Sequence, residues 1–173
     1  MNVLMSTTRL AFIAIIVTSS ISIAAQTAAS APKPNSIAIS LKMKEQQVPV
    51  GQSPWAILSV KNLTDESMEI HNYTYRVYVE GDKGEPPTTL VQRQMTGRFK
   101  PGDVPLRMDE NALWSIAPGR SDEHSFQLTY LYDLSEPGEY SVYAEVMDPY
   151  SHKLLRTNTV QFKVQAPKVQ APK

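Results

Sequence analysis

The sequence predicts an all-β domain, an antiparallel β-sandwich of about eight short strands. Three observations lead to this fold class. Apolar and polar residues alternate along short runs from residue 36 onward, Pro, Gly and Asn separate these runs, and no run after the first thirty residues has the apolar spacing of an amphipathic helix. The length of 173 residues suggests one folded domain.

Composition excludes several classes of site. The chain has no Cys, which rules out a disulfide framework, a thiolate zinc site and a lipid-anchoring Cys. Its 17 basic and 17 acidic residues give a formal net charge of zero. No strong field is therefore available to attract nucleic acid or anionic lipid, and we expect neither a nucleic-acid partner nor stable membrane insertion of the mature chain.

Residues 1–25 have the pattern of a bacterial secretory signal peptide, with a positive charge at Arg9, an apolar stretch and small residues near its end. The alternative is an uncleaved membrane anchor, but Thr and Ser interrupt the apolar run after a short distance. We expect a periplasmic or extracellular protein. The remaining parts are a flexible lead-in at 26–35, the sandwich at 36–164 and a flexible Pro-rich tail at 165–173 that repeats Lys-Val-Gln-Ala-Pro.

The stretch from Asp133 to Val146 is the most informative about the type of sandwich. Pro137-Gly138 fits a type II turn, and alternate residues from Tyr140 onward are apolar. In immunoglobulin-like sandwiches a Tyr near the start of strand F bonds back to the upstream backbone, which is known as the tyrosine corner. Tyr140 fits that role, the alternative being a buried Tyr in an unrelated strand. The pattern therefore predicts an immunoglobulin-like sandwich.

The same alternation places the other strands in order. Ser36–Lys44 is the first strand, and Trp55–Asn62 is the second, with Ala56, Leu58 and Val60 inward. Ser67–Glu80 changes phase, which either a bulge or two short strands would explain. The further predicted elements are an edge strand at Thr88–Met95, a long irregular loop at Thr96–Asn111, and strands at Ala112–Ile116, His124–Tyr132 and Leu154–Val164.

Four stretches resemble small bacterial immunoglobulin-like domains of exported proteins, over about residues 36–164: Val60–Asp65, Pro118–Ser121, Tyr132–Tyr140 and Thr157–Val164. A looser pattern of an Asn-x-Thr turn, a Pro-Gly-x-Ser turn and a Pro-Gly-x-Tyr strand is similar to bacterial proteinase-inhibitor domains of the same fold type. The resemblance implies a disulfide-free relative of antibody-type domains. Because its motifs are turns and strand starts, it implies a fold and no particular function.

No residue pattern indicates catalysis or cofactor binding. His71, His124 and His152 lie far apart, without a second His or Cys at ligand spacing. The acidic pairs near turns lack the spacing of a calcium loop, so weak calcium binding is a minor alternative. Nucleophile-elbow and phosphate-loop motifs are absent from the sequence. We therefore expect no catalytic, cofactor-binding or metal residues and a protein that is not an enzyme.

One candidate partner-binding surface is the outward face of the sheet that strands C, F and G would form. It would present Arg76, Tyr78 and Tyr143, residue types that are enriched at interaction hot spots. On the same face, the last strand would place Thr157, Thr159 and Gln161. The alternative is that these side chains only stabilise an exposed sheet through cross-strand pairs.

The second candidate surface is the long loop, because loops at the ends of a sandwich often carry recognition. It contains Arg98, Phe99 and Arg107 and is flanked by Trp114. We expect an exported, non-enzymatic interaction module that binds another envelope or extracellular protein. The alternatives are inhibition of an exported protease, which requires a rigid and exposed 96–111 loop, and carbohydrate binding on a platform of Tyr78 and Tyr143.

Overall fold

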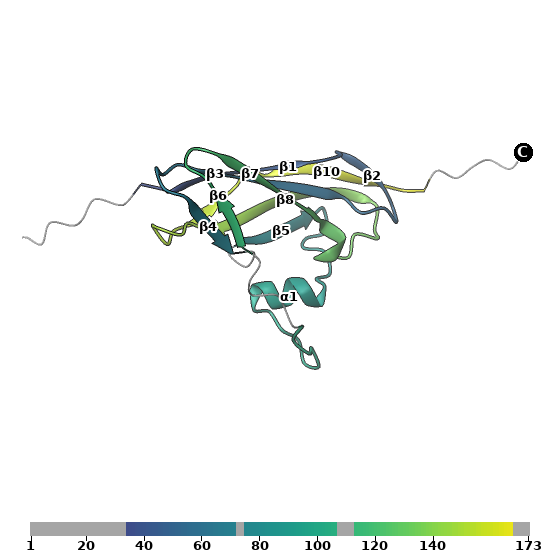
Figure 1. The fold of residues 1–173 in the computed structure, drawn as a ribbon. Coiled ribbons are helices and arrows are strands. Elements are labelled where there is room, and N and C mark those ends of the chain that lie inside the picture. The colour runs from purple at the N-terminus through teal and green to yellow at the C-terminus, as the bar shows by residue number, and fades with distance from the viewer. Residues whose placement is uncertain (1–33, 72–74, 107–112, 168–173) are drawn as a thin grey trace, which may run out of the picture. The chain divides into compact units, whose positions relative to one another are not determined.

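The computed structural model describes residues 34–71, 75–106 and 113–167, and within these residues the chain forms ten strands in two main sheets and one small sheet (Figure 1). The predicted signal peptide, most of the predicted lead-in and residues 168–173 of the predicted tail lie outside the described residues. The described part belongs to one compact unit, Lys33–Lys173.

The two main sheets have the strand order of an immunoglobulin-like sandwich. The first sheet has the order β1-β3-β7 and the second β2-β10-β8-β5, with β9 also paired to β8. These orders place β1, β3 and β7 as strands A, B and E, and β5, β8 and β10 as strands C, F and G. The prediction of an all-β sandwich is confirmed. The bounds are β1 Ile37–Met43, β2 Gln47–Pro49, β3 Trp55–Asn62, β5 Tyr75–Gly81, β7 Ser121–Gln127, β8 Gly138–Met147, β9 Leu154–Arg156 and β10 Val160–Gln165.

The core lies between the sheets and follows the predicted alternation. In β3, the side chains of Ala56, Leu58 and Val60 are fully buried, and in β8 Val142 and Ala144 are fully buried. The small sheet pairs β4 (Met68–His71) with β6 (Leu113–Ile116) and adds buried apolar side chains to the same core. Period-two alternation therefore determines which face of each strand the core covers.

Tyr140 forms the predicted tyrosine corner. Its hydroxyl donates a 2.8 Å hydrogen bond to the carbonyl oxygen of Glu136, and its ring stacks on Phe162 at a centroid distance of 5.4 Å. A Cβ atom at Gly81, which ends β5, would lie 2.9 Å from the Tyr140 ring, closer than carbon atoms pack. The corner therefore joins the turn before β8 to both neighbouring strands.

The predicted edge strand at Thr88–Met95 is wrong, because this segment forms helix α1 (Leu90–Thr96). The Thr89 hydroxyl accepts a 3.3 Å hydrogen bond from the backbone N–H of Gln92, and Gly97 ends the helix in the left-handed conformation with φ 69°. Thr-x-x-Gln at residues 89–92 is the sequence signature of a helix start, and Gly97 is the signature of a helix end. Pro86 and Pro87 lie outside the helix, three residues or more before its first residue, and do not interrupt it.

Three further segments differ from the predicted strands. Ser67–Glu80 is two strands in different sheets, β4 and β5, which was the second of the two predicted interpretations. The strand predicted at His124–Tyr132 begins earlier and ends at Gln127, where a 3₁₀ turn, η1 (Leu128–Tyr130), leaves Tyr130 65% exposed. Strand β2 was not predicted, because it has three residues and is recognisable only through its parallel pairing with β10.

The predicted final strand, Leu154–Val164, is divided by a bulge. Strand β9 pairs with β8 through Arg156 and Glu145, whereas β10 pairs with it through Val160 and Val142, a shift of one residue in register. Such a shift reverses the two faces of the strand. Thr157 consequently points inward with 6% exposure, and Arg156 takes the outward position that the alternation had assigned to Thr157.

Candidate functional site

The loop that follows α1, here called the 97–106 loop, is held against the helix by side-chain contacts. The Arg93 guanidinium binds both carboxylate oxygens of Asp103, at 2.7 and 2.6 Å, and these two side chains are only 15% and 11% exposed. The loop projects with α1 from the body of the sandwich, beside β5 (Figure 1). A bidentate pair of this kind fixes both the distance and the orientation of its partners.

The turn inside the loop is stabilised by the same carboxylate. Asp103 also accepts a 2.8 Å hydrogen bond from the backbone N–H of Lys100, across the Pro101-Gly102 turn. The hydrogen bond from Arg93, reinforced by that from Lys100, lowers the pKa of Asp103 to about 2. Asp103 therefore stays ionised, and keeps the ion pair, throughout the physiological pH range.

A second contact fixes the end of the loop. The amide of Gln94 forms two hydrogen bonds with the backbone of Leu106: Nε2 donates to the carbonyl oxygen at 2.9 Å, and Oε1 accepts from the N–H at 2.8 Å. The 97–106 loop is thus attached to one helix at both its middle and its end. Side-chain amides that satisfy backbone groups in this way hold a loop without regular structure in one conformation.

Three large apolar side chains are exposed on this fixed loop. Phe99 is 48%, Val104 73% and Leu106 43% exposed. Single exposed apolar residues are common, but a concentration of them on one short segment is typical of interaction surfaces. The sequence identified Phe99 as a candidate, and the structure adds Val104 and Leu106. Val104 and Leu106 flank Pro105 in a stretch without regular alternation, so the sequence alone does not indicate whether their side chains are exposed.

Arg98 connects the loop to the sheet face. Its guanidinium forms a bidentate ion pair with Glu85, at 2.8 and 3.0 Å. The hydrogen bond to Glu85 raises the pKa of Arg98, and the phenols of Tyr132 and Tyr78 contribute to the same shift. Glu85 also lies 3.5 Å from the Tyr132 hydroxyl, which donates a 3.0 Å hydrogen bond to the Val77 carbonyl of β5, so Arg98 links the loop to the edge of the sheet that carries Tyr78.

On the sheet face, Tyr78 and Tyr143 are directly opposed on β5 and β8 and stack at a centroid distance of 5.0 Å, with an angle of 19° between the rings. The guanidinium carbon of Arg156 lies 3.5 Å from the centroid of the Tyr143 ring. Sequence reasoning missed Arg156 because the bulge reverses the outward face there. Tyr143 thus has aromatic and cationic contacts of its own, which stabilise the sheet.

The structure describes some of the remaining predicted site residues and not others. Arg76 is exposed on β5, opposite Glu145 of β8. Arg107 lies outside the described residues, and so does the side chain of Trp114. The backbone of Trp114, in β6, pairs with Ile70 of β4. Of the predicted outward residues of the last strand, Thr159 and Gln161 are exposed and Thr157 is buried.

A separate cavity of about 200 Å³ lies beside the tyrosine corner, between the 81–87 and 133–140 segments. The Lys83 ammonium lies 2.9 Å from a carboxylate oxygen of Glu136 within it. Its lining includes five carboxylates: Asp82, Glu85, Asp133, Glu136 and Glu139. An acidic lining suits cations, and a Lys of this chain already lies among these carboxylates.

In the part of the chain that the structure describes, no three His, Cys, Asp or Glu side chains are grouped so that they could hold a metal ion. Among residues 34–71, 75–106 and 113–167, no helix is long and apolar enough to span a bilayer.

Comparison with known proteins shows no family. No family model and no curated protein matches the chain. Similar solved structures include a β-glucosidase from Listeria innocua in complex with isofagomine, at 16% identity over 78% of this chain and 17% of that one, with a TM-score of 0.39. The chain thus spans about a sixth of that enzyme.

Two shorter structures are similar over most of their length. A CARDB domain from Pyrococcus furiosus, in complex with di-metal ions, matches at 16% identity over 77% of this chain and 89% of that one, with a TM-score of 0.38. A FixG-related protein from Vibrio parahaemolyticus matches at 11% identity over 76% and 99%, with a TM-score of 0.41. At these identities and TM-scores, the similarities say nothing about what this chain binds.

Proposed function

We propose that this protein is an exported, non-enzymatic interaction module that binds another envelope or extracellular protein through the 97–106 loop. The best support is that large apolar side chains are exposed on a loop whose backbone is held in one conformation. Phe99, Val104 and Leu106 are exposed on a backbone that Arg93, Asp103 and Gln94 hold in place. A preorganised loop loses little conformational entropy on binding, so exposed apolar area on it contributes more to affinity.

The sheet face is the weaker candidate for the same function. The Tyr143 ring stacks on Tyr78, and the Arg156 guanidinium lies over the same Tyr143 ring. A sugar platform needs an aromatic face open to solvent, so this stacking does not favour carbohydrate binding at Tyr78 and Tyr143. The face lies beside Arg98 and would form the rim of an interface centred on the loop.

Inhibition of an exported protease through the same loop is the second candidate. The observation that favours it is the segment Arg98-Phe99-Lys100, with exposed side chains, followed by Pro101 and fixed through Asp103. Protease inhibitors bind through rigid, preorganised loops that change little between the free and bound states. A protease as the bound partner, with its activity lost on binding, would distinguish this role from simple adhesion.

The test is capture of a partner from the envelope extract of the source cells by the mature chain, residues 26–173, followed by direct binding of the purified partner. Phe99→Ala should weaken binding about tenfold or more, as truncation of a buried aromatic anchor does. Leu63→Ala is the matched control, because Leu63 is 51% exposed on the turn after β3, away from the loop sequence. Tyr143→Ala tests the sheet face.

The outcomes separate the proposals. Loss with Phe99→Ala and retention with Leu63→Ala support the loop. Loss with Tyr143→Ala alone places the site on the sheet and overturns the loop as the centre of the interface. Equal binding by all four proteins would contradict both surfaces.

A further inference from the structure

Three of the four edges of the two main sheets are blocked at particular positions within the described residues. An open edge presents unpaired backbone N–H and C=O groups to other strands, and proteins block such edges with side chains or short strands. At the β5 edge, the carbonyl oxygen of Val77 accepts hydrogen bonds from Gln92, at 2.6 Å, and from Tyr132, at 3.0 Å, while Gly81 exchanges two 2.9 Å bonds with Gly84.

The β1 and β2 edges are closed by other means. The side-chain amide of Asn158 makes both backbone hydrogen bonds of Leu41, each at 2.9 Å, as a neighbouring strand would. Strand β2 has three residues and ends at Pro49, which has no N–H to offer. The β7 edge differs from these three.

Hydrogen-bond registry shows which β7 groups face outward. The N–H of Leu128 donates to Pro54, and the N–H of Asn62 donates to the carbonyl of Arg120, each at 2.9 Å. In an antiparallel pair only every second residue bonds to the facing strand. The even-numbered residues of this segment therefore bond to β3, and the backbone groups of the odd-numbered residues point away from it. These outward residues are Ser121, Glu123, Ser125 and Gln127.

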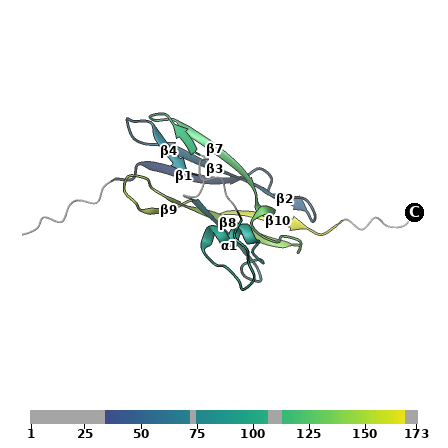
Figure 2. The ribbon, with the colours of Figure 1, turned by 60° about the horizontal axis from the view of Figure 1, so that its bottom comes forward.

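The outward groups of β7 have no strand partner within the described residues, where β3 is the only strand that pairs with β7. Figure 2 shows β7 at the border of its layer. One N–H on this edge is already used: Glu123 donates a 2.9 Å bond to its neighbour Asp122. The groups left over are the N–H and C=O of Ser121 and Ser125, the N–H of Gln127 and the C=O of Glu123, since the C=O of Gln127 lies at the N-cap of η1.

We propose that β7 pairs with β7 of a second copy of this chain, antiparallel about a two-fold axis at Ser125. In this register the two Ser125 residues exchange both backbone hydrogen bonds, and each Gln127 N–H donates to the Glu123 carbonyl of the other copy. In each copy these four bonds use both groups of Ser125, the N–H of Gln127 and the C=O of Glu123, and they leave the Asp122–Glu123 contact intact. Two three-stranded sheets then form one continuous sheet.

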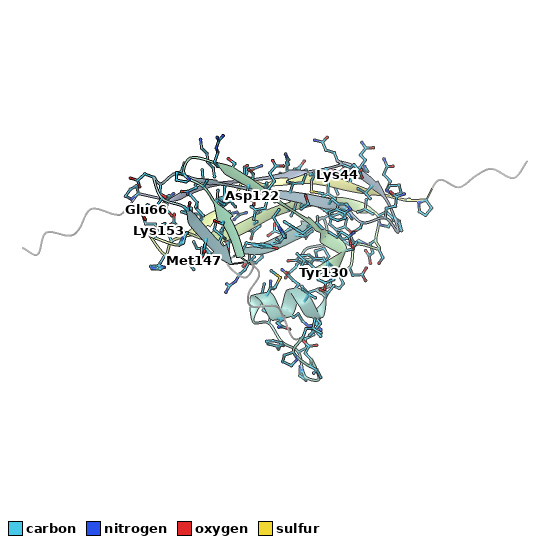
Figure 3. All side chains as sticks on the ribbon, viewed as in Figure 1. Lys44, Glu66, Asp122, Tyr130, Met147 and Lys153 are labelled. Carbon is cyan, nitrogen blue, oxygen red and sulfur yellow. The ribbon has the colours of Figure 1, made fainter. Side chains whose placement is uncertain are left out.

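Charge is compatible with this self-pairing. Glu123 lies opposite Gln127 of the second copy, so a carboxylate meets an amide, and Lys42 already neutralises Glu123 at 2.7 Å. Asp122, labelled in Figure 3, lies opposite Leu128 of the second copy. Like charges directly opposite each other destabilise a strand pair, and this register has none.

The test uses the symmetry of the proposed axis. With Asp or Lys at position 125, each copy meets its own like charge across the axis. Ser125→Asp and Ser125→Lys should each weaken the homodimer about fivefold in sedimentation experiments, and an equimolar mixture should restore a dimer at least as tight as wild type. Circular dichroism of each variant shows whether it folds.

Single-cysteine variants give a second measurement, because the chain has no Cys. Paired residues that exchange hydrogen bonds have Cα atoms about 5.5 Å apart, within the range of a disulfide. Ser125→Cys should form a disulfide-linked dimer under mild oxidation. Ser40→Cys, exposed on β1, is the control and should stay largely monomeric. A wild-type chain that remains monomeric into the millimolar range, or a mixture that forms no dimer, would overturn the proposal.

Discussion

At the scale of single residues, Tyr140 shows how one hydroxyl joins a turn to the sandwich. The pattern Pro-Gly-x-Tyr allowed the corner to be predicted, because a Tyr directly before an apolar alternation fits the start of strand F. The type II turn predicted at Pro137-Gly138 is wrong, because Gly138 does not have the positive φ that this turn requires and is already the first residue of β8. The bond to the Glu136 carbonyl and the stacking on Phe162 are the two contacts that the prediction required.

Replacing Tyr140 by Phe should lower the free energy of unfolding by about 1 kcal/mol, because the ring contacts remain and one hydrogen bond is lost. Urea denaturation of the variant should show a lower midpoint and an unchanged slope. Tyr150→Phe, at a tyrosine that is 46% exposed, is the control. Equal midpoints for the two variants would show that the Tyr140 hydroxyl contributes nothing.

Asp148 is a second residue with a large structural role, and it is buried. Its carboxylate accepts bonds from the N–H and hydroxyl of Ser36, at 2.6 and 2.7 Å, and from the N–H groups of Tyr150 and Ser151, at 3.0 and 2.8 Å. Burial alone would raise its pKa, but the bonds from Ser151 and Ser36 outweigh burial and lower it to about 2. The residue thus ties the start of the described chain to the turn after β8.

The sign of this shift predicts acid sensitivity. Because the carboxyl has a lower pKa in the folded chain than its ordinary 3.8, its contribution to stability is present above about pH 4 and is lost as the pH falls toward 2. The contribution is about 2 kcal/mol. Asp148→Asn should be less stable than wild type at pH 6, with a smaller further loss down to pH 2, as measured by urea denaturation across that range. Parallel pH curves for the two proteins would contradict this assignment.

At the scale of elements, α1 and the bulge explain which parts of the site the sequence could reveal. Alternation predicted β3 and β8 because their pairing is regular. It failed at Thr88–Met95, where capping by Thr89 and Gly97 outweighs the strand pattern. It failed again at Arg156, because a one-residue bulge is visible only in the pairing with β8. Local pattern therefore identifies strands, whereas long-range pairing decides which side chains share a face.

The ion pair between Arg93 and Asp103 should determine the order of the 97–106 loop. Asp103→Asn removes the charge and should speed trypsin cleavage of the Arg98–Phe99 bond several-fold, while the thermal midpoint changes little, because the loop opens locally. Asp133→Asn, at an exposed carboxylate of another loop, is the control. An unchanged cleavage rate in Asp103→Asn would show that the ion pair does not hold the loop.

At the scale of the whole molecule, the surfaces of the sandwich differ in how many of their polar groups and side chains are already engaged in contacts within the chain. The β5 and β1 edges are closed by Gln92, Tyr132 and Asn158, and the central rings of the sheet face are stacked among themselves. The 97–106 loop, with three exposed apolar side chains, and the β7 edge, with unpaired backbone groups, are the two surfaces on which the proposals rest, while Met147, Tyr150 and Leu154 are exposed as well. That the protein binds a partner and is not an enzyme stays a prediction from the sequence, whereas Val104, Leu106 and the outward groups of β7 could be identified only from the folded arrangement.

The most direct test of the loop as the binding site is hydrogen–deuterium exchange of the mature chain, alone and in complex with its captured partner. We expect the amides of the 97–106 loop, including those of Phe99 and Val104, to gain the largest protection in the complex, with little change in β3 and β8. Protection confined to β5 and β8 around Tyr78 and Tyr143, with unchanged exchange in the loop, would contradict the proposed site.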